Sequence, residues 1–358
     1  MKKRFKKAAS IILAGAMVLS MAACGNGQSA NTTATKEQNT GGSEATADFT
    51  PVELRMANQH SSDTIANQLD QEICDRIAEE TDGRIKITLY SDSSLGDYTK
   101  VFDELMLGSI EVAHISPVET YDSRVSATML PYLAFSYDDL LKVYDTEGYL
   151  FGQLNEALSA LGIKLTGVFC EGFNGIGSMQ ELTNANVAGQ DKGIICRSPM
   201  MDVYALCLQD LGFRVSSMPY SDTYTAMQTG VVAGLAGATA QVNYLSFRDI
   251  IKAYYDYRYI QEATMIMFNQ KVWDSFLPED QATIQNIINE TCEKAVTLAE
   301  ETNNDYMDKL EAEGIAVYKF TDDELAAFSA SCRENVWSQL AKNYPEGFLD
   351  AVKENLDN

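Results

Sequence analysis

The stretch "EETDGRIKITLYSDSSLGDYTKVFDELMLGSIEVAHIS", residues 79–116, alternates between strand and helix patterns and decides the fold class. Residues 84–90 alternate apolar and polar side chains, as a half-buried strand does, and residues 111–117 form a second strand-like run. The segment between them is helix-like and stops at Gly108, a residue type that often ends helices. This order predicts a strand, a helix and a second strand.

The same alternation extends on both sides of this stretch. Residues 52–58 have the pattern of a first strand, and residues 63–83 carry apolar side chains at helical spacing up to a glycine. Farther on, residues 161–173 and 193–197 form two more apolar, strand-like runs. Repeated alternation of strand and helix predicts an α/β protein with mostly parallel sheets.

A long helix is expected in the C-terminal third of the chain. Residues 278–313 form one continuous helical run. At 1.5 Å per residue such a helix is roughly 50 Å long, which is enough to lie along two domains. The chain of 358 residues is long enough to contain two.

The N-terminus has the pattern of an export signal. Residues 1–23 contain five basic residues, no acidic residue and an apolar run that is too short for a normal membrane span. In "MAAC" small residues precede Cys24, as in a bacterial lipobox, so Cys24 is the expected lipidation site; ordinary cleavage near Ala23 is the alternative. Residues 24–50 hold almost no large apolar side chain and are expected to form a flexible tether. We therefore expect an extracytoplasmic protein that a lipid anchors to the cell membrane.

The chain is strongly acidic. It has 27 basic and 51 acidic residues and a formal net charge of −24, which becomes −29 without the five basic residues of the signal peptide. This charge argues against nucleic acid as a partner and against a basic surface that binds anionic lipid. A locally positive pocket remains compatible with it.

Motifs of catalysis and metal binding are missing from the sequence. No GxSxG, HExxH, P-loop or dinucleotide motif occurs in a suitable context, and His60 and His114, the two histidines, show no metal-ligand spacing. We therefore expect neither an enzyme nor a metal or other cofactor. Six cysteines follow Cys24, and they are either small buried hydrophobic residues or partly paired, as export permits: Cys74, Cys170, Cys196, Cys207, Cys292 and Cys332.

Arg197 ends an apolar strand-like run in "KGIICRSPMM", residues 192–201. An arginine keeps its charge and prefers planar, two-pronged partners such as carboxylates. In open α/β sheets ligands bind at the carboxyl ends of the strands. Ser198 and Pro199 suit the start of a helix, whose amide groups attract anions. Arg197 therefore either pairs with an acid inside the protein or binds a carboxylate from outside.

Four segments in this order resemble the solute-binding proteins of TRAP transporters, the DctP-like family. They are the opening stretch, "LPYLAF" at residues 130–135, "GIICRSP" at residues 193–199 and "MPYSDTYTAMQTGVVAG" at residues 218–234. The resemblance extends over roughly residues 52–345.

The resemblance implies a two-lobed α/β fold of the periplasmic-binding-protein type (type II), with mixed sheets and a long helix that spans both lobes. Residues 51–172 and about 262–298 would form the first lobe, and residues 173–261 and about 299–358 the second. It also implies a monomeric receptor that binds a small organic acid between the lobes and docks on a small and a large membrane subunit for ion-driven uptake. A receptor of an ATP-driven importer, or one that serves a sensor, is the alternative.

The resemblance, together with the polar and aromatic residues that follow the expected strands, gives a set of candidate ligand-binding residues. Arg197 would bind the ligand carboxylate and Tyr220 would cover the ligand; packing at a helix start is the alternative for Tyr220. Glu119 would bind a ligand hydroxyl or pair with Arg197, and for Asn58 and His60 loop solvation is the alternative. The complete set is Asn58, His60, Ser116, Glu119, Phe173, Asn174, Arg197, Tyr220 and Thr239.

The sequence departs from the family pattern at its other polar anchors. Gly177 stands where many members have a second arginine. A site that loses hydrogen-bond donors changes its ligand, because unpaired buried polar groups are costly. We therefore expect one carboxylate on Arg197 and a remainder unlike a C4-dicarboxylate. Ala233, Ala236 and Gly237 replace the usual Asp, Glu and Asn, and Thr239, Gln241 and Asn243 are the nearby candidates to substitute for them.

Overall fold

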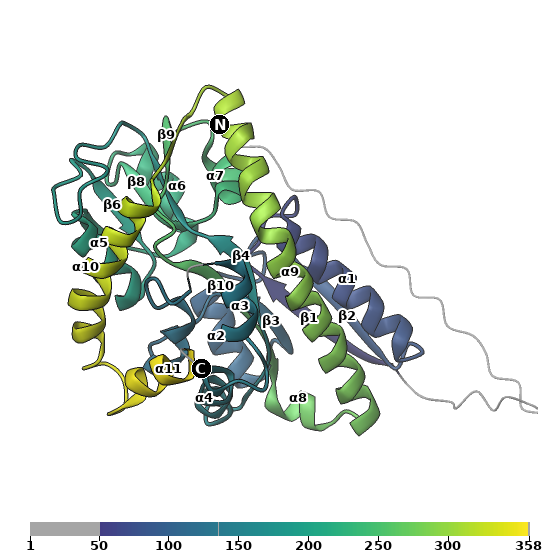
Figure 1. Cartoon of the computed structure of the whole chain (residues 1–358). Coiled ribbons are helices and arrows are strands. Elements are labelled where there is room, and N and C mark those ends of the chain that lie inside the picture. The colour runs from purple at the N-terminus through teal and green to yellow at the C-terminus, as the bar shows by residue number, and fades with distance from the viewer. Residues whose placement is uncertain (1–50, 135, 357–358) are drawn as a thin grey trace, which may run out of the picture. The chain divides into compact units, whose positions relative to one another are not determined.

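The computed structural model describes residues 51–134 and 136–356 (Figure 1). The expected signal peptide and the lipidation site at Cys24 lie outside the described residues. Within the described ranges, no helix combines the length and the apolar character that a membrane crossing requires.

The first sheet contains five strands in the order β2-β1-β3-β10-β4. The predicted strand–helix alternation builds its parallel half, where β1 pairs with both β2 and β3. Strand β10 comes from much later in the chain and runs antiparallel to β3 and β4, so the sheet is mixed. The elements are β1 (Val52–Asn58), α1 (Ile65–Glu80), β2 (Ile85–Tyr90), α2 (Tyr98–Leu107), β3 (Val112–Ile115), β4 (Ile163–Phe173) and β10 (Gln261–Asn269).

The second sheet contains six strands in the order β11-β9-β5-β8-β6-β7. Strand β6 carries Arg197 and pairs in parallel with β7 and β8, whereas β5 runs antiparallel to β8 and β9. The strands are β5 (Gly175–Ser178), β6 (Ile195–Ser198), β7 (Arg214–Ser217), β8 (Gly234–Ala238), β9 (Ala253–Asp256) and β11 (Ala316–Lys319). Two mixed sheets confirm the predicted fold class.

The chain crosses three times between the sheets. It leaves β4 for β5 through Asn174, returns from β9 to β10, and reaches β11 of the second sheet through the long helix that follows β10. Helix α9 (Pro278–Ala312) is the predicted long helix, and it contacts β4 and α1 as well as α7 (Ala240–Phe247) and β11. It thus packs against elements of both sheets, and Figure 1 shows it running past them.

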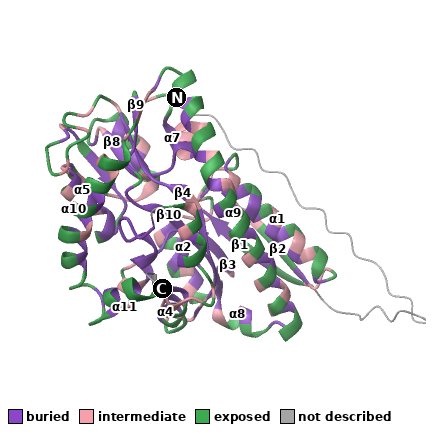
Figure 2. Cartoon of the chain, in the orientation of Figure 1, coloured by how far each residue is buried: buried purple, intermediate pink, exposed green. Residues whose placement is uncertain are grey.

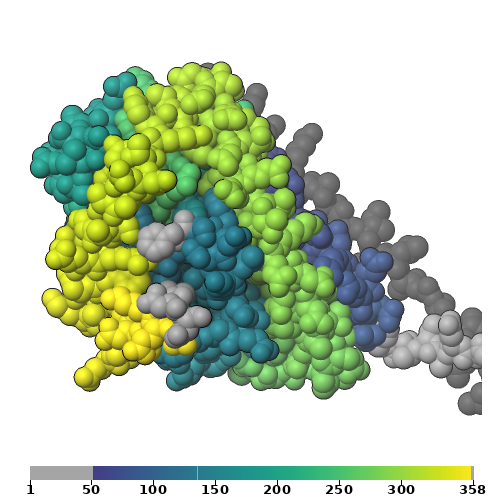
Figure 3. All heavy atoms as spheres, viewed as in Figure 1, coloured from purple at the N-terminus to yellow at the C-terminus, as the bar shows by residue number. Residues whose placement is uncertain are grey.

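The other helices pack against the sheets. In Figure 2, α9 and α10 each have buried residues on the side that faces the protein and exposed residues on the outer side. In the space-filling view of Figure 3, atoms of α9 and of the C-terminal helices flank the central part of the visible face. These helices are α3 (Tyr137–Val143), α4 (Tyr149–Ser159), α5 (Asp202–Leu211), α6 (Thr223–Gln228), α8 (Gln270–Asp274), α10 (Asp322–Leu340) and α11 (Phe348–Leu356), with 3-10 turns at Ser123–Met129 and Tyr220–Asp222.

The predicted helix start after Arg197 was wrong. Ser198 is the last residue of β6, and its hydroxyl donates to the carbonyl of Pro199 instead of capping a helix. Helix α5 begins at Asp202 after Met201, whose side chain makes no capping hydrogen bond. The anion attraction that we expected from a helix start at Ser198 is therefore absent from the position directly beside Arg197.

Candidate ligand-binding site

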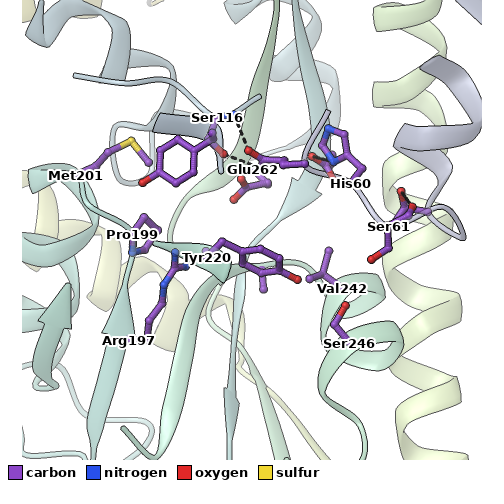
Figure 4. Close-up of a pocket in the computed structure, with 16 residues that line it drawn as sticks. His60, Ser61, Ser116, Arg197, Pro199, Met201, Tyr220, Val242, Ser246 and Glu262 are labelled. Atoms are coloured by element: carbon purple, nitrogen blue, oxygen red, sulfur yellow. Dashed lines mark hydrogen bonds and ion pairs between the residues drawn. The ribbon is translucent and has the colours of Figure 1, made fainter. Parts of the chain in front are cut away.

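One pocket brings Arg197 together with residues of both sheets (Figure 4). It encloses about 650 Å³ of empty space, including its open mouth. The first sheet and its loops contribute Gln59, His60, Ser61, Thr64, Tyr98, Ser116, Glu171 and Glu262. The second sheet and its loops contribute Arg197, Pro199, Met201, Tyr220, Gly237, Ala238, Val242 and Ser246.

Arg197 is buried, with 2% of its surface exposed, and the charge of Glu262 in the same pocket acts on it without a direct ion pair. Its Nε donates to the carbonyl of Met218 at 3.2 Å, and Nη1 donates to the carbonyl of Ala236 at 2.9 Å. None of the ion pairs among the described residues includes Arg197. Burial lowers the pKa of Arg197, yet a guanidinium stays protonated in proteins. A buried cation that forms no direct ion pair is costly, so the position beside Arg197 favours an anionic group of a ligand.

The wall around Arg197 holds the guanidinium in place. The ring of Tyr220 lies 5.9 Å from the guanidinium carbon, at the distance of a cation–π contact. Gly237 adopts a φ of +74°, and a Cβ there would lie 2.6 Å from Cγ of Pro199. The glycine therefore permits its backbone to lie close to the ring of Pro199 at the pocket wall.

His60 and Ser116 face the pocket from the first sheet. The Nδ1 atom of His60 lies 3.4 Å from Oε1 of Glu171, and its Nε2 is buried without a partner. Burial and the neighbouring ring of His114 lower the pKa of His60 well below its usual value, so the ring is neutral. Ser116 is held by Gln59, whose amide donates to its Oγ at 2.8 Å and accepts from its backbone N–H at 3.0 Å.

Two glutamates in the pocket were missed by the sequence analysis. Glu171 lies near the end of β4, and Glu262 lies near the start of the neighbouring strand β10. Burial, which is the main cause, raises the pKa of both carboxyl groups, and the charge of Glu262 raises the pKa of Glu171 further. The available signal was an acid within an apolar strand, the same signal that drew attention to Arg197.

Three of the expected ligand-binding residues lie behind the pocket instead of lining it. The amide of Asn58 donates to Asp70 at 2.7 Å and to Asn67 at 3.1 Å. The amide of Asn174 donates to Glu262 at 2.8 Å, so Asn174 contacts a pocket residue. The ring of Phe173 is buried against Tyr137, with 5.1 Å between the ring centres.

Glu119 and Thr239 also lie outside the pocket. Oε1 of Glu119 accepts from the backbone N–H of Asp202 at 2.7 Å, at the start of α5, so it does not pair with Arg197. Thr239 caps α7 by accepting from the N–H of Val242 at 3.5 Å. The pocket thus contains Arg197, Tyr220, His60 and Ser116 from the expected set, and their roles in binding stay predictions.

The position of the missing second arginine is filled by the protein itself. A Cβ on Gly177 would lie 2.0 Å from Oδ1 of Asn243. The amide of Asn243 donates to the carbonyl of Thr239 at 2.9 Å, which fixes the side chain inside the second sheet. Gln241 accepts from the N–H of Ile65 at 3.4 Å. Neither Gln241 nor Asn243 lines the pocket, so neither supplies a replacement anchor there.

Comparisons with known proteins agree with this architecture. The model of the family described as bacterial extracellular solute-binding protein, family 7, matches residues 56–343. The sialic acid-binding periplasmic protein SiaP of Vibrio cholerae is 23% identical over 74% of this chain and 82% of its own length. The C4-dicarboxylate-binding periplasmic protein DctP of Rhodobacter capsulatus is 25% identical over 76% of this chain and 81% of its own.

Solved structures share the fold. A TRAP periplasmic solute-binding protein from Desulfovibrio salexigens with bound orotic acid has a TM-score of 0.78 at 17% identity, and covers 85% of this chain and 98% of its own. One from Haemophilus influenzae with bound L-gulonate has a TM-score of 0.75 at 20% identity, and covers 85% and 97%. With its two mixed sheets and a family match over most of its length, the chain belongs to the bacterial extracellular solute-binding proteins of family 7, the DctP family.

Proposed function

We propose that the protein is an extracytoplasmic receptor that binds a small carboxylate-containing solute and delivers it to the small and large membrane subunits of a TRAP transporter. The observation that carries this proposal is Arg197, a buried guanidinium that lines the pocket and forms no direct ion pair with any described residue. A two-pronged arginine–carboxylate pair would supply the missing charge and fix the orientation of the ligand. The relatives and structures named above bind acids, which supports the same chemistry.

The finer parts of the proposal concern anchoring and assembly. Lipid on Cys24 would hold a monomeric receptor at the outer face of the cell membrane, with residues 25–50 as a tether. The receptor would release its solute unchanged, as its membership of a solute-binding family suggests. Ion-gradient-driven uptake follows from the TRAP assignment and not from the pocket.

Thermal-shift screening tests the carboxylate proposal. Residues 49–358 contain all the described residues and are the part to express. At least one organic acid, sugar acid or amino acid is expected to raise the melting temperature, because a ligand of the folded state stabilises it by mass action. In Arg197→Ala this shift should disappear.

The control is Arg248→Ala, which removes an exposed arginine of the same protein and should leave the shift intact. A carboxylate that stabilises Arg197→Ala as strongly as the unaltered protein would contradict the proposed role of Arg197.

A further inference from the structure

We infer that the solute is zwitterionic: besides the carboxylate on Arg197, it carries a protonated amine that lies next to Glu171 and Glu262. The inference rests on the proposed function, because all three side chains line the same pocket. It goes further by naming the second charged group of the ligand.

Glu262 has an oxygen that the protein leaves unpaired. Asn174 donates to its Oε2 at 2.8 Å and the hydroxyl of Tyr204 donates to the same oxygen at 2.9 Å. Among the described residues, no hydrogen bond or ion pair ends on Oε1. Two donors thus fix the carboxylate through one oxygen, and the other oxygen is available to a ligand in the pocket that Glu262 lines.

Glu171 is paired even less well. Its side chain is 8% exposed, and its contacts are long: 3.4 Å to Nδ1 of His60 and 3.5 Å from the hydroxyl of Thr264, both at Oε1. Charged hydrogen bonds are normally shorter than 3 Å. A buried carboxylate with such weak partners either carries a proton or requires a cation.

The backbone brings the two glutamates to one place. Glu262 pairs with Gly172 across strands β10 and β4, and the pairing shifts register directly after it, at a β-bulge. Bulges redirect side chains, and here Glu171 and Glu262 both line the pocket. Figure 4 shows Glu262 and His60 on the side opposite Arg197 and Tyr220, so a ligand can contact both sides at once.

The charges of the pocket favour a cationic group on the ligand. With Arg197 charged and His60 neutral, the lining carries a net charge of −1 once both glutamates are ionised, and this is the state that an ammonium next to them would favour. A monocarboxylate without an amine would raise the negative charge by one, and a dicarboxylate would raise it by two. A zwitterion leaves the charge unchanged, and its ammonium offers three donors to the unpaired oxygens.

A polyhydroxy acid is the competing ligand class. Its hydroxyl groups can donate to Glu171 and Glu262, but they bring no positive charge. In the empty pocket, burial raises the pKa of both carboxyl groups, and the charge of Glu262 raises the pKa of Glu171 further; a nearby ammonium would reverse this effect by favouring the charged forms. An ammonium therefore supplies both the hydrogen-bond donors and the positive charge that the carboxylates of Glu171 and Glu262 lack.

Matched ligand pairs test the inference by calorimetry. Each pair differs in one group, –NH₃⁺ or –OH: L-alanine and L-lactate, L-leucine and L-2-hydroxyisocaproate, L-glutamate and L-2-hydroxyglutarate, L-phenylalanine and L-phenyllactate. D-glucuronate and L-gulonate represent the polyhydroxy acids. At least one amino acid should bind about tenfold or more tightly than its hydroxy partner, since a charged hydrogen bond is lost with the amine.

Glu171→Gln and Glu262→Gln should each weaken binding of that amino acid about tenfold or more and shrink its advantage over the hydroxy acid. Glu301→Gln removes the same charge from an exposed position of α9 and is the control. It should change neither the affinity for the amino acid nor the advantage of the amino acid over the hydroxy acid. If one glutamine variant fails to fold, the other variant and the ligand pairs measured on the unaltered protein still test whether the ligand carries an amine.

The possible failures are distinguishable. If hydroxy or polyhydroxy acids bind through Arg197 while amino acids do not, the zwitterion inference is overturned and the proposed function stands. Undiminished amino-acid binding in both glutamine variants also overturns the inference. If no probe binds, the carboxylate proposal falls with it.

Discussion

At the residue scale, the carboxyl group of Glu171 makes the ligand-free protein sensitive to pH. Burial raises its pKa well above the ordinary value of 4.5, so the folded protein holds a proton that the unfolded chain releases. Stability therefore declines as pH rises from about 4.5 towards the pKa of the folded state, by up to about 1.4 kcal/mol per pH unit for one group. Glu171→Gln cannot titrate and should flatten this decline.

The measurement is urea unfolding of the ligand-free protein and of Glu171→Gln between pH 5 and pH 8. The lowered pKa of His60 acts in the opposite direction, because a folded neutral histidine gains stability as pH rises to about 6.5. Glu262 contributes with the same sign as Glu171. Both groups remain in the variant, so the difference between the two profiles reports Glu171, and parallel profiles would refute the raised pKa.

The residue scale also shows what sequence patterns can and cannot supply. Arg197 was recognisable because a charge in an apolar strand is unusual. Glu171 carried a similar signal, but its place in the pocket depends on β10, which pairs with β4 from about a hundred residues away. Asn58 differs from Arg197, since this polar residue at a strand end donates to Asp70 inside the protein. The apolar periodicity of a sequence predicts whether a side chain is buried, but it does not predict which residue that side chain contacts.

At the element scale, Asn303 fastens α9 to the segment that joins the two sheets. Its Oδ1 accepts from the backbone N–H of Ala240 at 3.2 Å, at the start of α7. Its Nδ2 donates to the carbonyl of Phe173 at 3.1 Å and to the hydroxyl of Tyr137 at 3.2 Å. Gly172 makes room for this contact, since a Cβ there would lie 2.8 Å from Nδ2.

Asn303→Leu should lower the free energy of unfolding by about 2–5 kcal/mol, because the N–H of Ala240 and the carbonyl of Phe173 would be buried without partners. Urea unfolding measures the change. Asn304→Leu is the matched control: it makes the same substitution at the next, exposed position and should cost less than about 0.5 kcal/mol. Equal effects of the two substitutions would show that α9 is not fastened through Asn303.

Elements were predicted better than their boundaries. The helix of residues 278–313 was expected almost to the residue, because its pattern is long and starts at a proline. The start of α5 was misplaced because Ser198 and Pro199 carry helix-start signals that β6 overrides by pairing with β7 and β8. Strand pairing is a long-range property, and local signals do not contain it.

At the scale of the whole molecule, hydrogen bonds join elements on either side of the pocket. Glu119 accepts from the N–H of Asp202 at 2.7 Å, Ser221 donates to Asp97 at 3.3 Å, and the N–H of Ile65 donates to Gln241 at 3.4 Å. Most of these contacts are long, and each connects an element of the first sheet with one of the second.

A ligand that contacts Arg197 on one side and the residues around Ser116 on the other should draw the sheets together. We therefore expect small-angle scattering to show a smaller radius of gyration when a carboxylate that raises the melting temperature is added. Arg197→Ala should keep the dimensions of the ligand-free protein under the same conditions, because one of the two sides then lacks its contact. Identical scattering with and without ligand would mean that the pocket is preformed. Helix α9 packs against elements of both sheets, and in that case it would hold the two sheets rigidly together instead of letting them move along it.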